Sequence, residues 1–187
     1  AGSGHCYKAP AYNRPDGVAP APLGQGYEVL MIDNDPNDGS VDDDILDDDF
    51  FDPLLARATK GEFLAILAAP PCSTFSVSRS FVGAGSDDNG PPPVRSRIHP
   101  DGLPTPPPGH ERELHQANLL VLRTLAIIKA AAFAGTQYII EHPADHGDPS
   151  LPGYFIDCDH APLWILPSVR DFARRTGGSK VTFAQCQ

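Results

Sequence analysis

The sequence lacks a long apolar run and is poor in cysteine. No apolar stretch reaches the ~18 to 20 residues of a membrane span, and the opening residues AGSGHCYKAPAYN do not have the pattern of a signal peptide. The four cysteines, Cys6, Cys72, Cys158 and Cys186, are far apart and form no Cys-x-x-Cys pair. We therefore expect a reduced, intracellular protein in the nucleus or the cytoplasm with no membrane partner, although an even number of cysteines also allows disulfides.

Positive charge is also scarce. The chain has 14 lysines and arginines against 24 aspartates and glutamates, which gives a formal net charge of -10. Proteins that bind nucleic acid on their own normally present a basic face, so this balance argues against strong DNA binding by the chain alone. Much of the negative charge lies in DNDPNDGSVDDDILDDDFFD, residues 33–52. Basic side chains gather in or beside one proline-rich loop: Arg79, Arg95, Arg97, His99, His110 and Arg112.

Proline and glycine, by contrast, are abundant, with 21 and 17 of 187 residues. A hydrophobic fraction of 41% argues against wholesale disorder, so these residues indicate long loops around one core. A chain of this length buries roughly 70% of its unfolded surface when it folds as one domain, and we predict a single domain over residues 1–187. Its longest loop, residues 77–109, has no periodicity and is typical of a functional lid, a binding loop or a disordered segment.

Apolar runs and helical patterns alternate along the chain. The short apolar runs lie at 27–33, 63–68, 137–142 and 181–186, and the segments with helical spacing lie at 52–60, 111–135 and 167–178. The runs have no polar face, which is typical of parallel strands buried on both sides. Gly135 is a natural stop for the long helix, and Ser168 with Asp171 resembles a capping box at the start of the last one. Strands that alternate with helices predict an open α/β sheet.

Three of the predicted strands end in side chains that can act on a ligand. Asp33 ends the first apolar run, Cys72 follows two prolines after the second, and Glu141 lies near the end of the third. In open α/β sheets, ligands bind beyond the carboxyl ends of the strands. A thiol on a turn that prolines fix can meet a substrate there, and a carboxylate from a nearby strand can orient that substrate. The sequence therefore predicts a site at this edge of the sheet.

These stretches resemble the motifs of the carbon-5 cytosine methyltransferases. APPCSTFS, residues 69–76, is similar to their Pro-Cys nucleophile loop, and IIEHPADHG, residues 139–147, is similar to their Glu-Asn-Pro motif. VLMIDNDP, residues 29–36, and DDDIL, residues 42–46, resemble the elements that hold the cofactor. The resemblance implies a Rossmann-like methyltransferase fold, with a mostly parallel sheet flanked by helices and a catalytic loop at 70–110. It also implies S-adenosylmethionine-dependent methyl transfer to carbon 5 of cytosine in DNA, with RNA as the lesser alternative.

The chemistry of this family explains the residue types. Carbon 5 of cytosine is a poor nucleophile, so a cysteine thiolate first adds to carbon 6 and the ring then attacks the methyl group. By resemblance, Cys72 is that thiolate, and Glu141 binds ring nitrogen 3 and the exocyclic amine. Arg79 contacts a phosphate or favours the thiolate form of the cysteine. A base in a duplex has to be flipped out of the stack first, and the loop at 77–110 is the expected lid.

The same resemblance assigns the cofactor, S-adenosylmethionine, to three residues. Asp33 holds its ribose, Asp44 faces its adenine amine, and Pro70 is the third cofactor-binding residue. The other aspartates of the acidic run are typical of a solvated face. We predict no metal site, because two polar clusters lack the spacing of zinc ligands. These clusters are His142, Asp145 and His146, and Cys158, Asp159 and His160.

The chain departs from the family in three places. It has no apolar strand that leads into a Phe-x-Gly-x-Gly loop, and His142 stands where the family has Asn. It also ends at Gln187, before the family's later basic motifs and target-recognition domain. These departures keep a second hypothesis open, a catalytically inactive domain that acts as a structural or interaction subunit. A protein partner that completes the missing C-terminal part fits either hypothesis.

Simpler interpretations stay open for single residues. A free cysteine such as Cys72 is most often a small buried hydrophobe. Asp33 fits a turn, and Glu141 fits a helix cap or an exposed surface position. Arg95 and Arg97 are typical of solvated charges in a loop.

Overall fold

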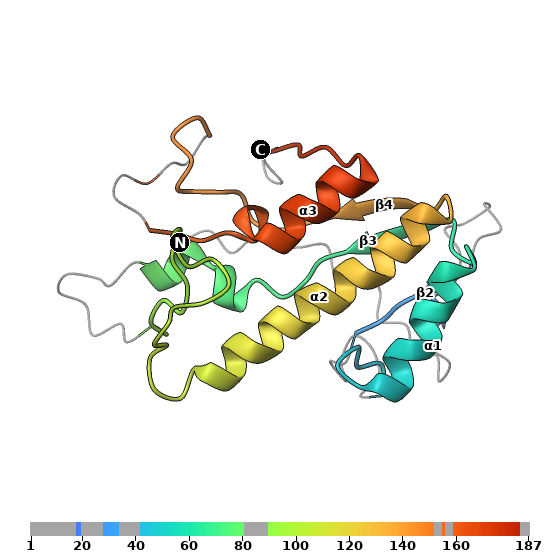
Figure 1. Ribbon diagram of the computed structural model, residues 1–187, viewed down its shortest axis with the longest axis horizontal. Helices are drawn as coiled ribbons and strands as arrows, with labels where there is room; N and C mark the ends of the chain where they lie inside the picture. Colours follow the sequence, from blue (N-terminus) through green and yellow to red (C-terminus); the bar gives the residue numbers. More distant parts are fainter. Residues whose placement is uncertain are drawn as a thin grey trace. The chain divides into compact units, whose positions relative to one another are not determined.

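The larger part of the chain is described by a computed structural model (Figure 1). The described residues are 18–19, for which the backbone alone is described, and 28–33, 42–80, 90–151, 155 and 159–183. By its internal contacts the chain divides into two compact units, where the sequence predicts one domain. The units are residues 1–52 with 183–187, and residues 53–182.

The first unit holds a small antiparallel sheet. Strand β1, Val18–Ala19, pairs with strand β2, Val29–Leu30. The prediction of a parallel strand buried on both sides at 27–33 is wrong, because β2 runs antiparallel to its partner and Met31 beside it is 41% exposed. An apolar run indicates extended backbone, but it does not determine which strand pairs with it or in which direction.

Helix α1, Asp48–Thr59, confirms the helix predicted at 52–60 and begins one turn earlier. The Asp47 carboxylate accepts a hydrogen bond of 2.9 Å from the backbone N–H of Asp49, which is the contact an N-cap side chain makes. Acidic side chains in the first turn also interact favourably with the helix dipole. Part of the acidic run therefore starts a helix as well as facing solvent.

A pair of parallel strands forms the centre of the second unit. Strand β3, Ala65–Ala68, lies beside strand β4, Gln137–Ile140, with Ala65 opposite Gln137 and Ala68 opposite Ile140. Helix α2, Glu111–Phe133, lies between the two strands in the chain and runs along them (Figure 1). The predicted α/β arrangement is confirmed in this form, as a two-stranded parallel sheet with helices. The run predicted as a last strand forms no strand at 181–183, and its remainder lies outside the described residues.

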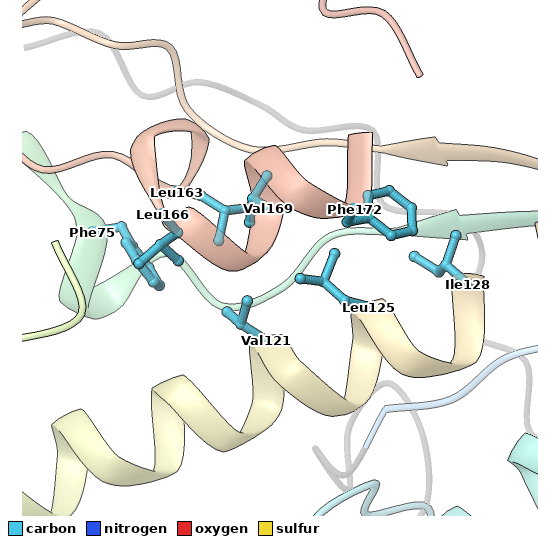
Figure 2. Close-up of a cluster of buried hydrophobic side chains, with 8 residues drawn as sticks. All are labelled: Phe75, Val121, Leu125, Ile128, Leu163, Leu166, Val169 and Phe172. Carbon is cyan, nitrogen blue, oxygen red and sulfur yellow. The ribbon is translucent and has the colours of Figure 1, made fainter. Parts of the chain in front are cut away.

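The core of the second unit lies on one face of this sheet. Helices α2 and α3, Pro167–Thr176, both pack there (Figure 2). Its buried side chains are Phe75, Val121, Leu125, Ile128, Leu163, Leu166, Val169 and Phe172, with Ile66, Ala68, Tyr138, Ile140 and Trp164 packed against them. On the opposite face Leu67 is 75% exposed and Ile139 is 65% exposed. The prediction that β3 and β4 are buried on both sides is therefore wrong for the described residues.

The predicted helix ends are partly confirmed. Gly135 follows α2 with a φ of 95°, and Gly177 ends α3 with a φ of 72°, a left-handed conformation that glycine adopts without strain. The capping box predicted for Ser168 and Asp171 is wrong, because Ser168 lies inside α3. The Asp171 carboxylate instead forms ion pairs with two arginines in the last turn of the same helix.

Helix α2 is also long and apolar enough to cross a membrane, with a mean hydropathy of 1.3 over an 18-residue window. The expectation that no stretch is long and apolar enough to span a membrane is therefore corrected for α2. Val121, Leu125 and Ile128 of α2 pack in the core. The apolar composition of α2 therefore has an explanation inside the folded unit.

Candidate functional site

The turns that carry Cys72 and Glu141 leave the sheet side by side. Strands β3 and β4 are parallel, so their carboxyl ends lie at the same edge, with Ala68 opposite Ile140. The backbone N–H of Glu141 donates a hydrogen bond of 2.8 Å to the Ala68 carbonyl. The ladder therefore extends one residue beyond β4, and the half-buried Glu141 begins its turn from a fixed position.

Cys72 follows two prolines that take the chain out of the sheet. Proline has no N–H for a strand ladder, so a Pro-Pro pair ends strand pairing and stiffens the turn. Cys72 then precedes the 3-10 turn η1, Ser73–Phe75, and its carbonyl accepts a hydrogen bond of 2.9 Å from Phe75 N–H. The Cys72 thiol is free and the residue is exposed. It is therefore presented to solvent, unlike a structural buried cysteine.

Two aromatic contacts hold the turns together. The rings of Phe75 and His142 meet edge-on, with centroids 5.3 Å apart. The His142 ring also lies 6.2 Å from the ring of Trp164, again edge-on. The Trp164 indole N–H donates a hydrogen bond of 2.8 Å to the Pro143 carbonyl. The residue after Glu141 thus contacts a side chain of the Cys72 turn and a side chain that binds the Glu141 turn.

His142 is a neutral, buried imidazole. Burial lowers its pKa to about 4, and the nearby Pro143 carbonyl opposes this shift only in part. Neither ring nitrogen makes a hydrogen bond of normal geometry within the described part of the chain. The His142 turn is therefore supported by ring packing and by the Trp164 contact.

Arg95 is buried beneath the Cys72 turn. It is 4% exposed, and its guanidinium lies over the Phe75 ring, 3.9 Å from the centroid. Burial lowers the pKa of Arg95 to about 10, and Asp101 opposes this shift. The side chain therefore stays positively charged at neutral pH. The interpretation of Arg95 as a solvated loop charge is wrong.

Arg79 is also buried, at 6% exposure. Its Nε donates a hydrogen bond of 2.6 Å to the Ser73 carbonyl, its Nη1 donates one of 3.1 Å to the Pro92 carbonyl, and it forms an ion pair with Glu113 of α2. These contacts give Arg79 a role in holding the proline-rich loop against η1 and α2. Its contact with a phosphate stays a prediction.

Arg97 joins the same loop to the chain beyond β4. Its guanidinium donates to both carboxylate oxygens of Asp145, over 2.7 and 3.2 Å, and to the His160 carbonyl over 3.1 Å. Hydrogen bonding to Asp145 raises the pKa of Arg97, so the guanidinium stays charged. Residues 90–110 of the predicted lid are thus held by three arginines that bind different parts of the second unit.

The hollow beside η1 is too small for a nucleobase. It is lined by Arg79, Arg95 and His160 among others, and the volume open to water is about 10 Å³, about one water molecule. His160 Nε2 donates a hydrogen bond of 2.7 Å to the Phe75 carbonyl, and burial lowers the pKa of this imidazole. The residues that line this hollow support the Cys72 turn.

The predicted cofactor residues are divided between the two units. Asp33 follows β2 in the first unit and is exposed, and Asp44 lies in the turn before α1, where its Oδ1 accepts a hydrogen bond of 2.8 Å from Leu46 N–H. Pro70 follows β3 in the second unit and is half-buried. Their role in binding a cofactor stays a prediction. Among the described residues, no three His, Cys, Asp or Glu side chains are grouped so as to hold a metal ion.

The supporting side chains around the two turns were not foreseen from the sequence. Phe75 lies in APPCSTFS, but no supporting role was assigned to it, and Trp164 and Arg95 belong to no motif that indicates catalysis. The available signal for Arg95 was its position in PPPVRSR, directly after the apolar Val94. Comparisons with protein-family models, with curated proteins and with solved structures find no match for this chain.

Proposed function

We propose that this chain transfers a methyl group from S-adenosylmethionine to carbon 5 of cytosine in DNA, inside the cell, on a Rossmann-like methyltransferase domain. One observation carries the proposal. The Pro-Pro-Cys turn and the Glu-His-Pro turn begin at the same edge of the β3–β4 sheet and contact each other through Phe75 and His142. A nucleophile and a carboxylate held in this way can act on the same ring.

In the proposed reaction the Cys72 thiolate adds to carbon 6 of a flipped cytosine, and the ring gains electron density at carbon 5. One Glu141 carboxyl oxygen accepts a hydrogen bond from the exocyclic amine, and a proton shared between the other oxygen and ring nitrogen 3 stabilises the negative charge that develops on the ring during addition. When bound, S-adenosylmethionine would supply the methyl group to carbon 5 and would leave as S-adenosylhomocysteine. Loss of the carbon 5 proton to water and elimination of the Cys72 thiolate would then restore the aromatic ring and free Cys72.

The cofactor supplies the methyl group, and the acidic side chains of this chain suit its polar groups. Carboxylates accept hydrogen bonds from hydroxyl and amine donors, and the exposed Asp33 is proposed to bind the ribose hydroxyls. Asp44 uses one carboxylate oxygen to accept a hydrogen bond from Leu46 N–H, and the proposal assigns its other oxygen to the adenine amine. Pro70 is the third residue that the resemblance assigns to the cofactor.

The test is transfer of a labelled methyl group. The protein is incubated with S-adenosylmethionine that carries a tritiated methyl group and with cytosine-containing DNA, and the nucleosides are then separated. We expect label in 5-methylcytosine with the wild-type protein and with Cys158→Ala, and no label with Cys72→Ala. Label in any other nucleoside, or label that persists in Cys72→Ala, contradicts the proposal.

A second candidate function has its own supporting observation. The face of the β3–β4 sheet that carries Leu67 and Ile139 is exposed in the described residues, and exposed apolar side chains of this size are typical of interaction surfaces. In that case the chain is a catalytically inactive subunit of a larger assembly, with a protein partner. Binding of S-adenosylhomocysteine in calorimetry separates the two functions, because the inactive subunit does not need to bind it.

A further inference from the structure

The Arg95 side chain makes several contacts with the Cys72 turn and with the elements beside it. Its Nε and Nη2 donate hydrogen bonds of 3.3 and 3.1 Å to the Thr74 hydroxyl. Its Nη1 donates one of 2.8 Å to the Pro100 carbonyl, and Nη2 donates another of 2.8 Å to the Asn118 amide oxygen of α2. The guanidinium thus connects η1 to a rigid helix and to its own loop.

Two of the three residues of η1 are held by this one side chain. Thr74 is held by hydrogen bonds, and Phe75 is held by the stacked guanidinium 3.9 Å from its ring centroid. A planar guanidinium can stack on a ring and donate in its own plane at the same time, which an ammonium group cannot do. Cys72 directly precedes η1, so the position of its thiol depends on these contacts.

The contacts of Arg95 stabilise the fold only at a high cost in desolvation of the guanidinium. Its hydrogen-bond acceptors among the described residues are neutral, and no carboxylate there lies in ion-pair contact with it. A buried charge with neutral partners loses hydration that those partners replace only in part. An apolar side chain would fill the same space at a lower desolvation cost. The geometry that Arg95 imposes is therefore a better explanation for its presence than stability.

The same contacts reach the Glu141 turn. The Arg95 guanidinium stacks on the Phe75 ring, and the Phe75 ring in turn contacts the ring of His142, the residue next to Glu141. We propose that Arg95 is a positioning residue that fixes the Cys72 thiol relative to the Glu141 carboxylate. This inference rests on the proposed function for its effect on catalysis, whereas its effect on the geometry of η1 is measurable without any reaction.

The experiment compares Arg95→Met and Arg95→Lys with the matched control Arg97→Met. Arg97 lies in the same loop and binds Asp145 and the His160 carbonyl, and in the described residues its side chain makes no direct hydrogen bond or ring contact with η1. The first readout is hydrogen exchange at the Phe75 amide, which is bonded to the Cys72 carbonyl. Because bonds to charged groups are strong, we expect exchange to rise about tenfold or more in both Arg95 variants and to stay unchanged in Arg97→Met.

The second readout is the split between kcat and KM for methyl transfer. Displacement of a nucleophile by about 1 Å costs roughly 100-fold in rate, so we expect kcat to fall by about that factor in Arg95→Met while KM changes little. A purely structural role would lower the melting temperature and leave the Phe75 exchange rate and the kcat of the folded protein unchanged, and that result overturns the inference.

Two further measurements keep the outcome decisive. If Arg95→Met does not fold, Thr74→Val removes the shared acceptor of two hydrogen bonds and keeps the side-chain shape, and it is expected to raise Phe75 exchange in the same direction. If the wild type transfers no methyl group, the proposed function fails while the exchange data still test the positioning of η1. Unchanged exchange in Thr74→Val and Arg95→Lys contradicts the inference whatever the activity.

Discussion

The ring of Phe75 meets the ring of His142 edge-on, with centroids 5.3 Å apart and planes at 87°. These residues are far apart in the chain, and each belongs to a turn at the carboxyl edge of the β3–β4 sheet. Edge-to-face ring pairs have a preferred geometry and add to the energy of burial. The contact therefore links the turn that presents Cys72 to the turn that presents Glu141.

Glu141 gives the first prediction. Glu141→Gln keeps the shape of the side chain but removes the carboxyl group that is proposed to share a proton with ring nitrogen 3 during addition. We expect kcat to fall by about 100- to 1,000-fold, the range for loss of one electrostatic contact in a transition state, while the melting temperature changes little. Steady-state kinetics and thermal unfolding measure the two effects. The control is Glu62→Gln on an exposed ion pair, and equal kinetic effects in both variants would refute the assignment.

The buried imidazole of His142 predicts how stability depends on pH. Its pKa is about 4 in the folded protein and about 6.5 in an unfolded chain. Above pH ~6.5 both states are neutral at this site and its full contribution to stability is present. Between pH ~6.5 and ~4 the unfolded state binds a proton that the folded state does not, so stability falls by up to about 3 kcal/mol.

Urea unfolding at a series of pH values measures this slope, and His142→Leu is the matched variant. Leucine has a similar volume and no proton to bind, so the variant is expected to lose most of the dependence in this range. His160, whose pKa burial also lowers, leaves a slope of the same sign. A slope as steep in His142→Leu as in the wild type would show that another group is responsible.

Neighbouring isoleucines on the two faces of β4 give a paired prediction. Ile139 is 65% exposed, whereas Ile140 packs against the core. Threonine keeps the β-branched shape in both places, so strand propensity changes little. We expect Ile139→Thr to change the free energy of unfolding by about 0.5 kcal/mol or less and Ile140→Thr to lower it by about 1 to 3 kcal/mol. A large loss from Ile139→Thr would mean that this face is covered.

The ion pair between Arg79 and Glu113 predicts the strength of the loop attachment. Glu113→Gln removes the charge that neutralises a buried guanidinium, and it also removes the partner of His110 Nδ1. We expect a loss of about 1 to 3 kcal/mol in the free energy of unfolding. Glu111→Gln, two residues earlier and exposed, is the control and is expected to cost less than about 0.5 kcal/mol. Equal effects would indicate that the attachment contributes no stability.

Local sequence patterns predicted the central elements of the second unit well. Apolar runs at 63–68 and 137–142 and a long helical pattern between them are local features, and they form β3, β4 and α2. The pairing of the run at 27–33 was not predictable in this way, since strand direction depends on distant partners. The exposed face of β3 and β4 was missed for a related reason, because a run of apolar residues does not state which neighbours cover it.

For the site, the sequence predicted a role for the turns of Cys72 and Glu141 but not how these turns are supported. Cys72 and Glu141 stand out because prolines and strand ends surround them. Arg95 does not, because an arginine in a proline-rich segment is usually solvated, and its burial depends on Phe75 and on Asn118 of α2. Contacts of this kind join distant residues through stacking and single hydrogen bonds, and such pairs leave no periodic signal.

The most direct test of the central claim is covalent capture of Cys72. The protein is mixed with S-adenosylmethionine and an oligonucleotide that carries 5-fluorocytosine in random flanking sequence, since fluorine at carbon 5 blocks the final elimination and retains the adduct. The account predicts a denaturant-resistant complex whose crosslinked peptide contains Cys72, formed by the wild type and by Cys158→Ala but not by Cys72→Ala. A complex that survives Cys72→Ala, a crosslink at another residue, or no complex with the wild type would contradict it.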